Sequence, residues 1–233
     1  MKTSFLTRLF DTVSPRTCAA CGRRLTVDQT FLCTRCYHDI PLTHLEDNPY
    51  DNPMARLFWG KIPIERAAAY FYFYPHSEHG NIIYDMKYRG RPEIAQRLGA
   101  MAARRFAEKG FFDGIDAIIP LPVTRRRFWQ RGYNQSVEIA RGISSVTGMP
   151  ILTDAVRRTK FTVSQTTMHG EDRQRNVEGV FLLKDQQRLA GLHVLLVDDI
   201  ITSGATTLSC GRELAKAPGV RISIMSMGLT RVG

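Results

Sequence analysis

The sequence predicts an α/β fold in which a mostly parallel sheet is covered by helices on both faces. Strand-like apolar segments alternate along the chain with segments that have apolar residues at helical spacing. The segment 192–197 (LHVLLV) is almost continuously apolar, which is typical of a strand buried on both faces of a parallel sheet. The chain has 233 residues, 43% of them hydrophobic and 23% charged, which excludes a mainly disordered chain and allows one full-sized domain with a small appendage.

The individual elements are predicted from residue 67 onward. Strands are expected where short apolar runs are bounded by turn residues, at 67–74, 115–119, 177–183, 192–197 and 220–229. Helices are expected where helical spacing ends near Gly or Pro, at 94–107, 134–146 and 206–216. Because parallel sheets bind ligands at the carboxyl ends of their strands, functional residues are expected just after these strands.

The chain is basic, and its charge is unevenly placed. It has 32 Lys and Arg against 22 Asp and Glu, a net charge of +10. Residues 87–131 hold eleven basic and four acidic residues, so most of the excess lies in one stretch and an anionic ligand or partner is expected. No apolar run is long enough for a membrane span, and residues 1–12 lack the cleavage pattern of a signal peptide, so we expect a cytoplasmic protein.

Four of the five cysteines form two Cys-x-x-Cys pairs separated by eleven residues: Cys18, Cys21, Cys33 and Cys36. This doubled spacing is typical of two knuckles that complete a tetrahedral site, so we predict one structural Zn²⁺. Disulfides or a redox pair are the alternatives, and they fit a cytoplasmic chain without thioredoxin-like surroundings poorly. We predict a zinc-binding domain with its linker at 1–60 and a second domain at 61–233.

The strongest functional signal follows the segment 192–197. Asp198 and Asp199 come directly after it and can accept hydrogen bonds from a vicinal diol. Small and hydroxyl-bearing residues come next: Thr202, Ser203, Gly204, Ala205 and Thr206. A helix is expected to begin at this loop, and its free N–H groups favour a phosphate. The pattern therefore predicts a ribose 5-phosphate site, the alternative being a strand–turn–helix whose polar residues only cap the helix.

The stretch 194–207 resembles the motif with which type I phosphoribosyltransferases bind 5-phosphoribosyl 1-pyrophosphate (PRPP). Together with the cysteine pairs, residues 18–230 resemble the ComF family of bacterial competence proteins, also called the GntX or amidophosphoribosyltransferase-like family. This resemblance implies a type I phosphoribosyltransferase fold behind a small zinc-ribbon-like domain. It also implies that Asp198 and Asp199 hold the ribose hydroxyls as catalytic residues, that residues 202–206 cradle the 5-phosphate, and that Mg²⁺ accompanies PRPP.

The resemblance extends to the arginine-rich run 125–135 (RRRFWQRGYNQ). It is similar to the family segment that lies where these folds bind pyrophosphate, which assigns that role to Arg125, Arg127 and Arg131. A solvated basic turn is the alternative. Lys87, in the run KYRG, resembles another family segment that reaches the same anion, with a surface loop as the alternative.

The long segment 154–176 has no clear periodicity, but Gln165, Arg173 and Asn176 resemble a further family pattern. In these folds a mobile loop of this region closes over the reacting carbon, which would bring Arg173 to the ligand. Hydrogen bonding between the loop and the sheet is the alternative.

Three functions follow from the resemblance, and the first is favoured. The chain would be a competence protein that binds PRPP or ribose 5-phosphate and serves DNA uptake. It would otherwise be an active phosphoribosyltransferase of nucleotide metabolism with an unidentified acceptor, although Thr202 stands where purine-salvage relatives have an Asp. The third possibility is a non-catalytic zinc adaptor for a competence helicase or recombination mediator, or a single-stranded DNA-binding protein that uses Phe128, Trp129 and Tyr133 for stacking.

Overall fold

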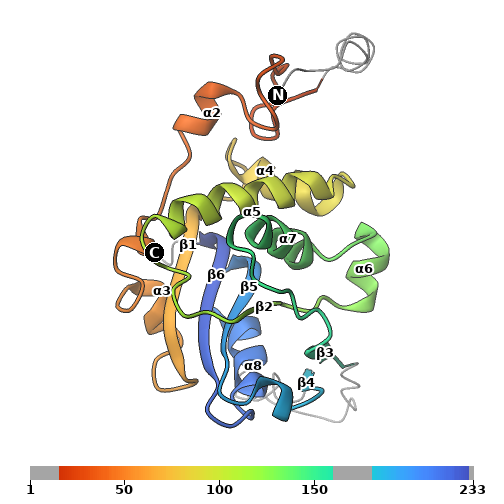
Figure 1. The fold of residues 1–233 in the computed structure, drawn as a ribbon. Coiled ribbons are helices and arrows are strands. Elements are labelled where there is room, and N and C mark those ends of the chain that lie inside the picture. Colours follow the sequence, from red (N-terminus) through yellow and green to blue (C-terminus); the bar gives the residue numbers. More distant parts are fainter. Residues whose placement is uncertain (1–15, 160–179, 231–233) are drawn as a thin grey trace, which may run out of the picture.

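A four-stranded parallel sheet forms the centre of the computed structural model, which describes residues 16–159 and 180–230 (Figure 1). The strand order is β1-β6-β5-β2. The strands are Ile64–Phe73 (β1), Ala117–Pro120 (β2), His193–Ile201 (β5) and Arg221–Thr230 (β6). A separate antiparallel pair joins Val156–Arg158 (β3) to Phe181–Leu183 (β4). The predicted α/β fold with a mostly parallel sheet is therefore confirmed.

Helices cover both faces of the sheet. The helices Pro92–Ala107 (α5) and Gln135–Thr147 (α7) pack against each other on one face, and Ala205–Leu214 (α8) lies on the other (Figure 1). The two faces follow from right-handed crossovers, because β1–α5–β2 and β5–α8–β6 cross the sheet in opposite directions. Helices α5 and α7 approach closely at Gly142, where an added Cβ would lie 2.0 Å from the backbone oxygen of Gln96.

Most of the predicted helices and strands agree with the structure to within a few residues. Two strands differ more. Of the predicted strand 177–183 only residues 181–183 are described, as β4, and the predicted strand 192–197 extends to Ile201 as β5. Four short helices were not predicted: Thr34–His38 (α2), Pro53–Arg56 (α3), Gly80–Tyr88 (α4) and Arg125–Arg131 (α6). Helix α6 buries none of its residues, so it has no apolar periodicity by which sequence patterns find helices. Among the described residues, no helix combines the length and apolar character needed to cross a membrane.

The segment between the cysteines and the sheet is packed rather than free. The N–H of Tyr72 in β1 donates to the carbonyl of Pro41, and the N–H of Thr43 donates to the carbonyl of Tyr70. Asn52 accepts from the first N–H groups of α3 and donates 2.8 Å to the carbonyl of Ala67. The linker expected from its turn-forming residues therefore lies along β1, and the domain boundary near residue 60 stays a prediction.

Candidate functional site

A cavity of about 340 Å³ lies at the carboxyl ends of the parallel strands. Its walls include Phe73 at the end of β1, Leu121 just after β2 and the last residues of β5. Its polar lining consists of Lys87, Arg127, Arg131, Ser136, Arg158, Asp198, Asp199 and the loop and helix residues 202–207. A position at this edge of the sheet is where ligands of open α/β sheets bind.

The structure brings most of the expected site residues together in this cavity. Lys87 comes from α4, and Arg127 and Arg131 come from α6. The acid pair lies in β5, residues 202–204 form the loop that follows, and residues 205–206 begin α8. Arg125 instead lines a neighbouring cavity of about 530 Å³ beside Phe128 and Trp129. Arg173, Gln165 and Asn176 lie outside the described residues. The functional roles of all these residues stay predictions.

The acid pair is held in two different environments. Asp198 is buried, with Oδ1 accepting from the N–H of Asp199 at 2.8 Å and Oδ2 accepting from the hydroxyl of Thr207 at 3.1 Å. Burial, followed by the neighbouring charge of Asp199, raises the pKa of Asp198 to about 7. Asp199 lies 3.1 Å from the ammonium group of Lys87, and both side chains are more than four-fifths covered. Asp198 therefore retains a proton far more readily than an exposed aspartate.

The loop after β5 leaves the start of α8 open to an anion. Gly204 is the N-cap residue at φ +74°, a conformation that favours glycine, and it has no side chain to cap the helix. Of the first-turn N–H groups, that of Ala205 donates to a loop side chain, the hydroxyl of Ser203 at 3.5 Å. An added Cβ at Gly204 would lie 3.2 Å from the ring of Phe58, so the position is also restricted in space. The remaining first-turn N–H groups and the positive end of the helix dipole suit a phosphate group.

Four cationic side chains from three elements face the acid pair. On α6, Thr124 accepts from the N–H of Arg127 at the start of the helix, and Gly132 ends it at φ +78°. Arg131 donates to Gln135 at 2.7 Å and lies over the ring of Tyr88. With Lys87 and Arg158 included, four cations face two carboxylates, so the cavity favours a multiply charged anion.

Arg158 is a site residue that the sequence reading missed. It lies in the short strand β3, with its guanidinium 5.2 Å from the ring centre of Phe181. Burial, and then the charge of Arg127, lowers the pKa of Arg158, whereas Asp198 raises it. A strand of three residues at the start of a stretch without periodicity offers no sequence signal except the charge itself.

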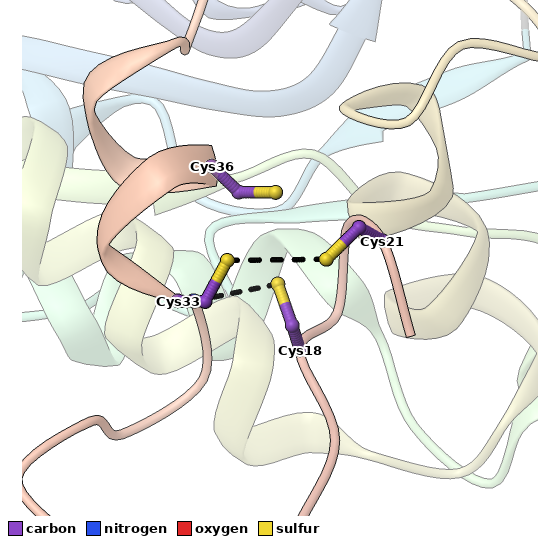
Figure 2. A group of neighbouring side chains, drawn as sticks. All are labelled: Cys18, Cys21, Cys33 and Cys36. Carbon is purple, nitrogen blue, oxygen red and sulfur yellow. Dashed lines mark hydrogen bonds between the residues drawn. The ribbon is translucent and has the colours of Figure 1, made fainter. Parts of the chain in front are cut away.

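The four paired cysteines converge on one point (Figure 2). All four sulfur atoms lie within 4.8 Å of one another, and the sulfurs of Cys21 and Cys33 are 3.8 Å apart. Tetrahedral zinc with bonds of about 2.3 Å requires sulfur atoms about 3.8 Å apart. The N–H of Cys33 donates to the sulfur of Cys18 at 3.4 Å, and none of these cysteines forms a disulfide. The cluster can hold a metal ion, in agreement with the predicted zinc site.

The Cys36 thiol is buried, so it needs a nearby cation to lose its proton. Burial raises the pKa of Cys36, which would leave a metal-free Cys36 as a neutral thiol. A coordinated cation deprotonates a thiol outright, so metal binding reverses this effect. Cys210 lies apart from the cluster, buried in α8.

We predict that the stability of the ligand-free Asp198→Asn variant, compared with that of the native chain at the same pH, increases from pH 5 to pH 8. The folded-state pKa of Asp198 is raised to about 7, so the native chain loses stability as pH rises from about 4 through about 7. Asn keeps the shape and carries no charge. The unfolding free energy of the variant minus that of the native chain should therefore increase by on the order of 2 kcal/mol from pH 5 to pH 8. Urea denaturation at both pH values measures it, with Asp185→Asn as a surface control. A pH trend of equal size in the control would contradict the assignment of this pH dependence to Asp198.

Comparisons with known proteins find homologues along most of the chain, although no family model matches it. The chain is 27% identical over 210 residues to proteins named DNA utilization protein YhgH from Escherichia coli K12 and from Shigella flexneri, covering 89% of this chain and 87% of each relative. It is 36% identical over 117 residues to Competence protein F of Haemophilus influenzae, covering 50% of each chain.

Solved structures of similar fold include the glutamine PRPP amidotransferase of Bacillus subtilis, at a TM-score of 0.41 and 19% identity, covering 61% of this chain and 30% of that one. The adenine phosphoribosyltransferase of Saccharomyces cerevisiae gives a TM-score of 0.34 and 18% identity, covering 58% and 70%. Both TM-scores are too low to support an argument, so the fold assignment rests on the sheet and its helices. The homologues named for DNA utilization and for competence confirm the resemblance to the ComF family.

Proposed function

We propose that this chain binds PRPP or ribose 5-phosphate with Mg²⁺ in the cavity at the ends of the parallel strands, and that it serves DNA uptake in the cytoplasm. The observation that carries the proposal is the meeting, in one cavity, of an acid pair, four cationic side chains and a helix start whose N-cap residue is a glycine. PRPP has a vicinal diol, a phosphate and a pyrophosphate, and each group has a matching partner there.

The proposed orientation follows from these partners. The start of α8 and its loop receive the 5-phosphate, because that is the N–H end of the helix. Asp198 and Asp199 accept from the ribose hydroxyls. The pyrophosphate lies against Arg127 and Arg131, which can each donate two hydrogen bonds to one phosphate group. In a transfer reaction a nitrogen nucleophile displaces pyrophosphate from C1, and these residues position the sugar and stabilise the departing charge.

The acid pair also fits Mg²⁺ in its donor chemistry. Mg²⁺ prefers carboxylate oxygens and retains several of its waters, and the pair offers two carboxylates beside the proposed phosphate groups. When bound, the ion would neutralise charge on the pyrophosphate. In the ligand-free chain the ammonium group of Lys87, 3.1 Å from Asp199, neutralises that carboxylate.

The role in DNA uptake is supported by the names of the relatives. DNA utilization and competence are the roles for which those homologues are named, and the first of them extends over most of this chain. The net charge of +10 fits a protein that works near nucleic acid as well as one that binds a charged nucleotide precursor.

We predict that PRPP binds the native chain in the presence of Mg²⁺ and that Asp198→Asn/Asp199→Asn lowers its affinity at least tenfold. The variant keeps the side-chain shapes but removes the carboxylates that accept from the diol and attract the metal. Isothermal titration calorimetry measures both affinities. Asp185→Asn, an exposed carboxylate outside the cavity, is the matched control and should bind as the native chain does.

The absence of PRPP binding to the native chain would contradict the proposed ligand. Equal binding by the double variant and the native chain would contradict the proposed site but not the ligand.

We propose further that the ion of the cysteine cluster is Zn²⁺, with one ion per chain and a structural role. Four thiolates leave no open coordination position, which is the arrangement of structural zinc sites. Metal analysis of the purified chain should give one zinc ion per chain. Cys33→Ser should lose the ion and increase proteolysis within residues 16–40, whereas Cys210→Ser should retain it. A metal-free native chain with a protease-resistant N-terminal part would contradict this role.

A second candidate ligand, single-stranded DNA, is supported by helix α6. Trp129 is 82% exposed and Phe128 46%, and none of the seven helix residues is buried. Exposed aromatic rings beside arginines are typical of surfaces on which bases stack while phosphates are neutralised.

For this candidate we predict that the affinity for a single-stranded oligonucleotide falls steeply with salt, with log K dropping by about 0.7 per phosphate contacted for each tenfold rise in salt. Trp129→Ala should weaken binding by removing about 1–3 kcal/mol of stacking. Fluorescence anisotropy across a salt series measures both effects, with the exposed Tyr50→Ala as control. A salt-independent affinity, or an equal loss in the control, would contradict DNA binding by α6.

A further inference from the structure

Helix α4 contacts the cysteine cluster at its first residues. The side-chain amide of Asn81 donates 2.9 Å to the carbonyl of Ala20, inside the first Cys-x-x-Cys pair. Nε2 of His79, the residue before α4, lies 3.0 Å from the carbonyl of Cys36 in the second pair and is the donor there, because a carbonyl only accepts. Glu78 also pairs with Arg35 between Cys33 and Cys36. Both cysteine knuckles are thus held by the start of one helix.

The last turn of α4 contacts the cavity. The ammonium group of Lys87 lies 3.1 Å from the carboxylate of Asp199. The ring of Tyr88 lies beneath the guanidinium of Arg131, and the carbonyl of Met86 accepts from the hydroxyl of Tyr133. Three consecutive residues of α4 therefore contact either the acid pair or the arginine-rich segment.

A helix of this length transmits displacements between its ends. The nine residues of α4 span about 13 Å, and the intrahelical hydrogen bonds keep the two ends in fixed relation. Ile82, Ile83 and Met86 are fully buried and hold the helix against the core, so a change in how its first turn is held alters its angle on that core. The hydrogen bonds of His79 and Asn81 therefore act on the same helix that carries Lys87 to Asp199.

Those two hydrogen bonds require an ordered cysteine module. The described part of the module, residues 16–40, is too small to fold on a hydrophobic core alone, and metal binding supplies the folding free energy in such modules. The acceptor carbonyls of Ala20 and Cys36 adjoin the metal-binding sulfurs, so they are fixed in place when the metal is bound.

We propose that His79 and Asn81 are positioning residues that couple the metal site to the anion-binding cavity through α4. Occupancy of the cysteine cluster places Lys87 and thereby strengthens binding of the phosphorylated ligand, and ligand binding in turn raises the affinity for the metal. This reciprocity is a thermodynamic requirement, because coupling between two sites acts equally in both directions. The inference rests on the proposed ligand and on the proposed metal.

The test measures the equilibrium affinity of the full-length chain for zinc by competition with a chromogenic chelator, with and without saturating PRPP and Mg²⁺. In the native chain PRPP should raise the zinc affinity about five- to tenfold, within the usual range of coupling between sites. In Asn81→Leu, which removes the amide donor, PRPP should change the zinc affinity less than twofold. A merely structural role would lower the zinc affinity equally with and without PRPP and leave the ratio of the two affinities unchanged.

Tyr84→Phe is the matched control, because Tyr84 lies on the exposed side of the same helix. It should retain the native ratio. PRPP binding to the native chain, verified by calorimetry, without a rise in zinc affinity overturns the coupling and leaves the proposed function intact. The absence of PRPP binding to the native chain overturns both. A native ratio retained in Asn81→Leu and in His79→Phe overturns the assignment to these two residues.

Discussion

The burial of Asp198 at the end of the central strand β5 is the constraint on which the rest of the site depends. Strand β6 pairs with β5 as far as Ile201, whereas the pairing of β2 with β5 ends at Val197, so Asp198 lies where β5 opens to the cavity on one side. A carboxylate at such a place is costly unless hydrogen bonds and nearby cations compensate. Thr207 and the N–H of Asp199 supply the hydrogen bonds, and Lys87 neutralises the neighbouring acid. The acid pair is thus stable without ligand but remains close to its neutral form.

The cations that surround this pair come from separate parts of the chain. Lys87 belongs to α4, Arg127 and Arg131 to α6, and Arg158 to β3. None of these elements is a strand of the four-stranded sheet, and β3 pairs with β4 instead. Side-chain contacts also hold them in place. Tyr133 ties α6 to α4 through the carbonyl of Met86, and Phe181 supports the guanidinium of Arg158. The excess of positive charge in the cavity gives a multiply charged anion a favourable field.

Specific polar contacts join the cysteine module to the rest of the protein. Its knuckles meet the start of α4 through Asn81 and His79, while the following segment pairs with β1 near Pro41 and Thr43. These links place the four-cysteine cluster at one end of the same helix that presents Lys87 to Asp199. The cysteine module and the cavity therefore contact opposite ends of α4, although the residues involved are far apart in the sequence.

The sequence by itself determined the sheet, its main helices, the acid pair with its loop, and the four cysteines. These features have local signals: buried strands are continuously apolar, ligand loops follow them, and metal ligands keep short spacings. Only the tertiary structure decided that the arginine run forms a helix, that Arg125 lies outside the cavity and Arg158 inside it, and that α4 connects the cysteines to Lys87. Such features depend on contacts between residues far apart in the chain, and local patterns carry no information about which distant element a side chain will meet.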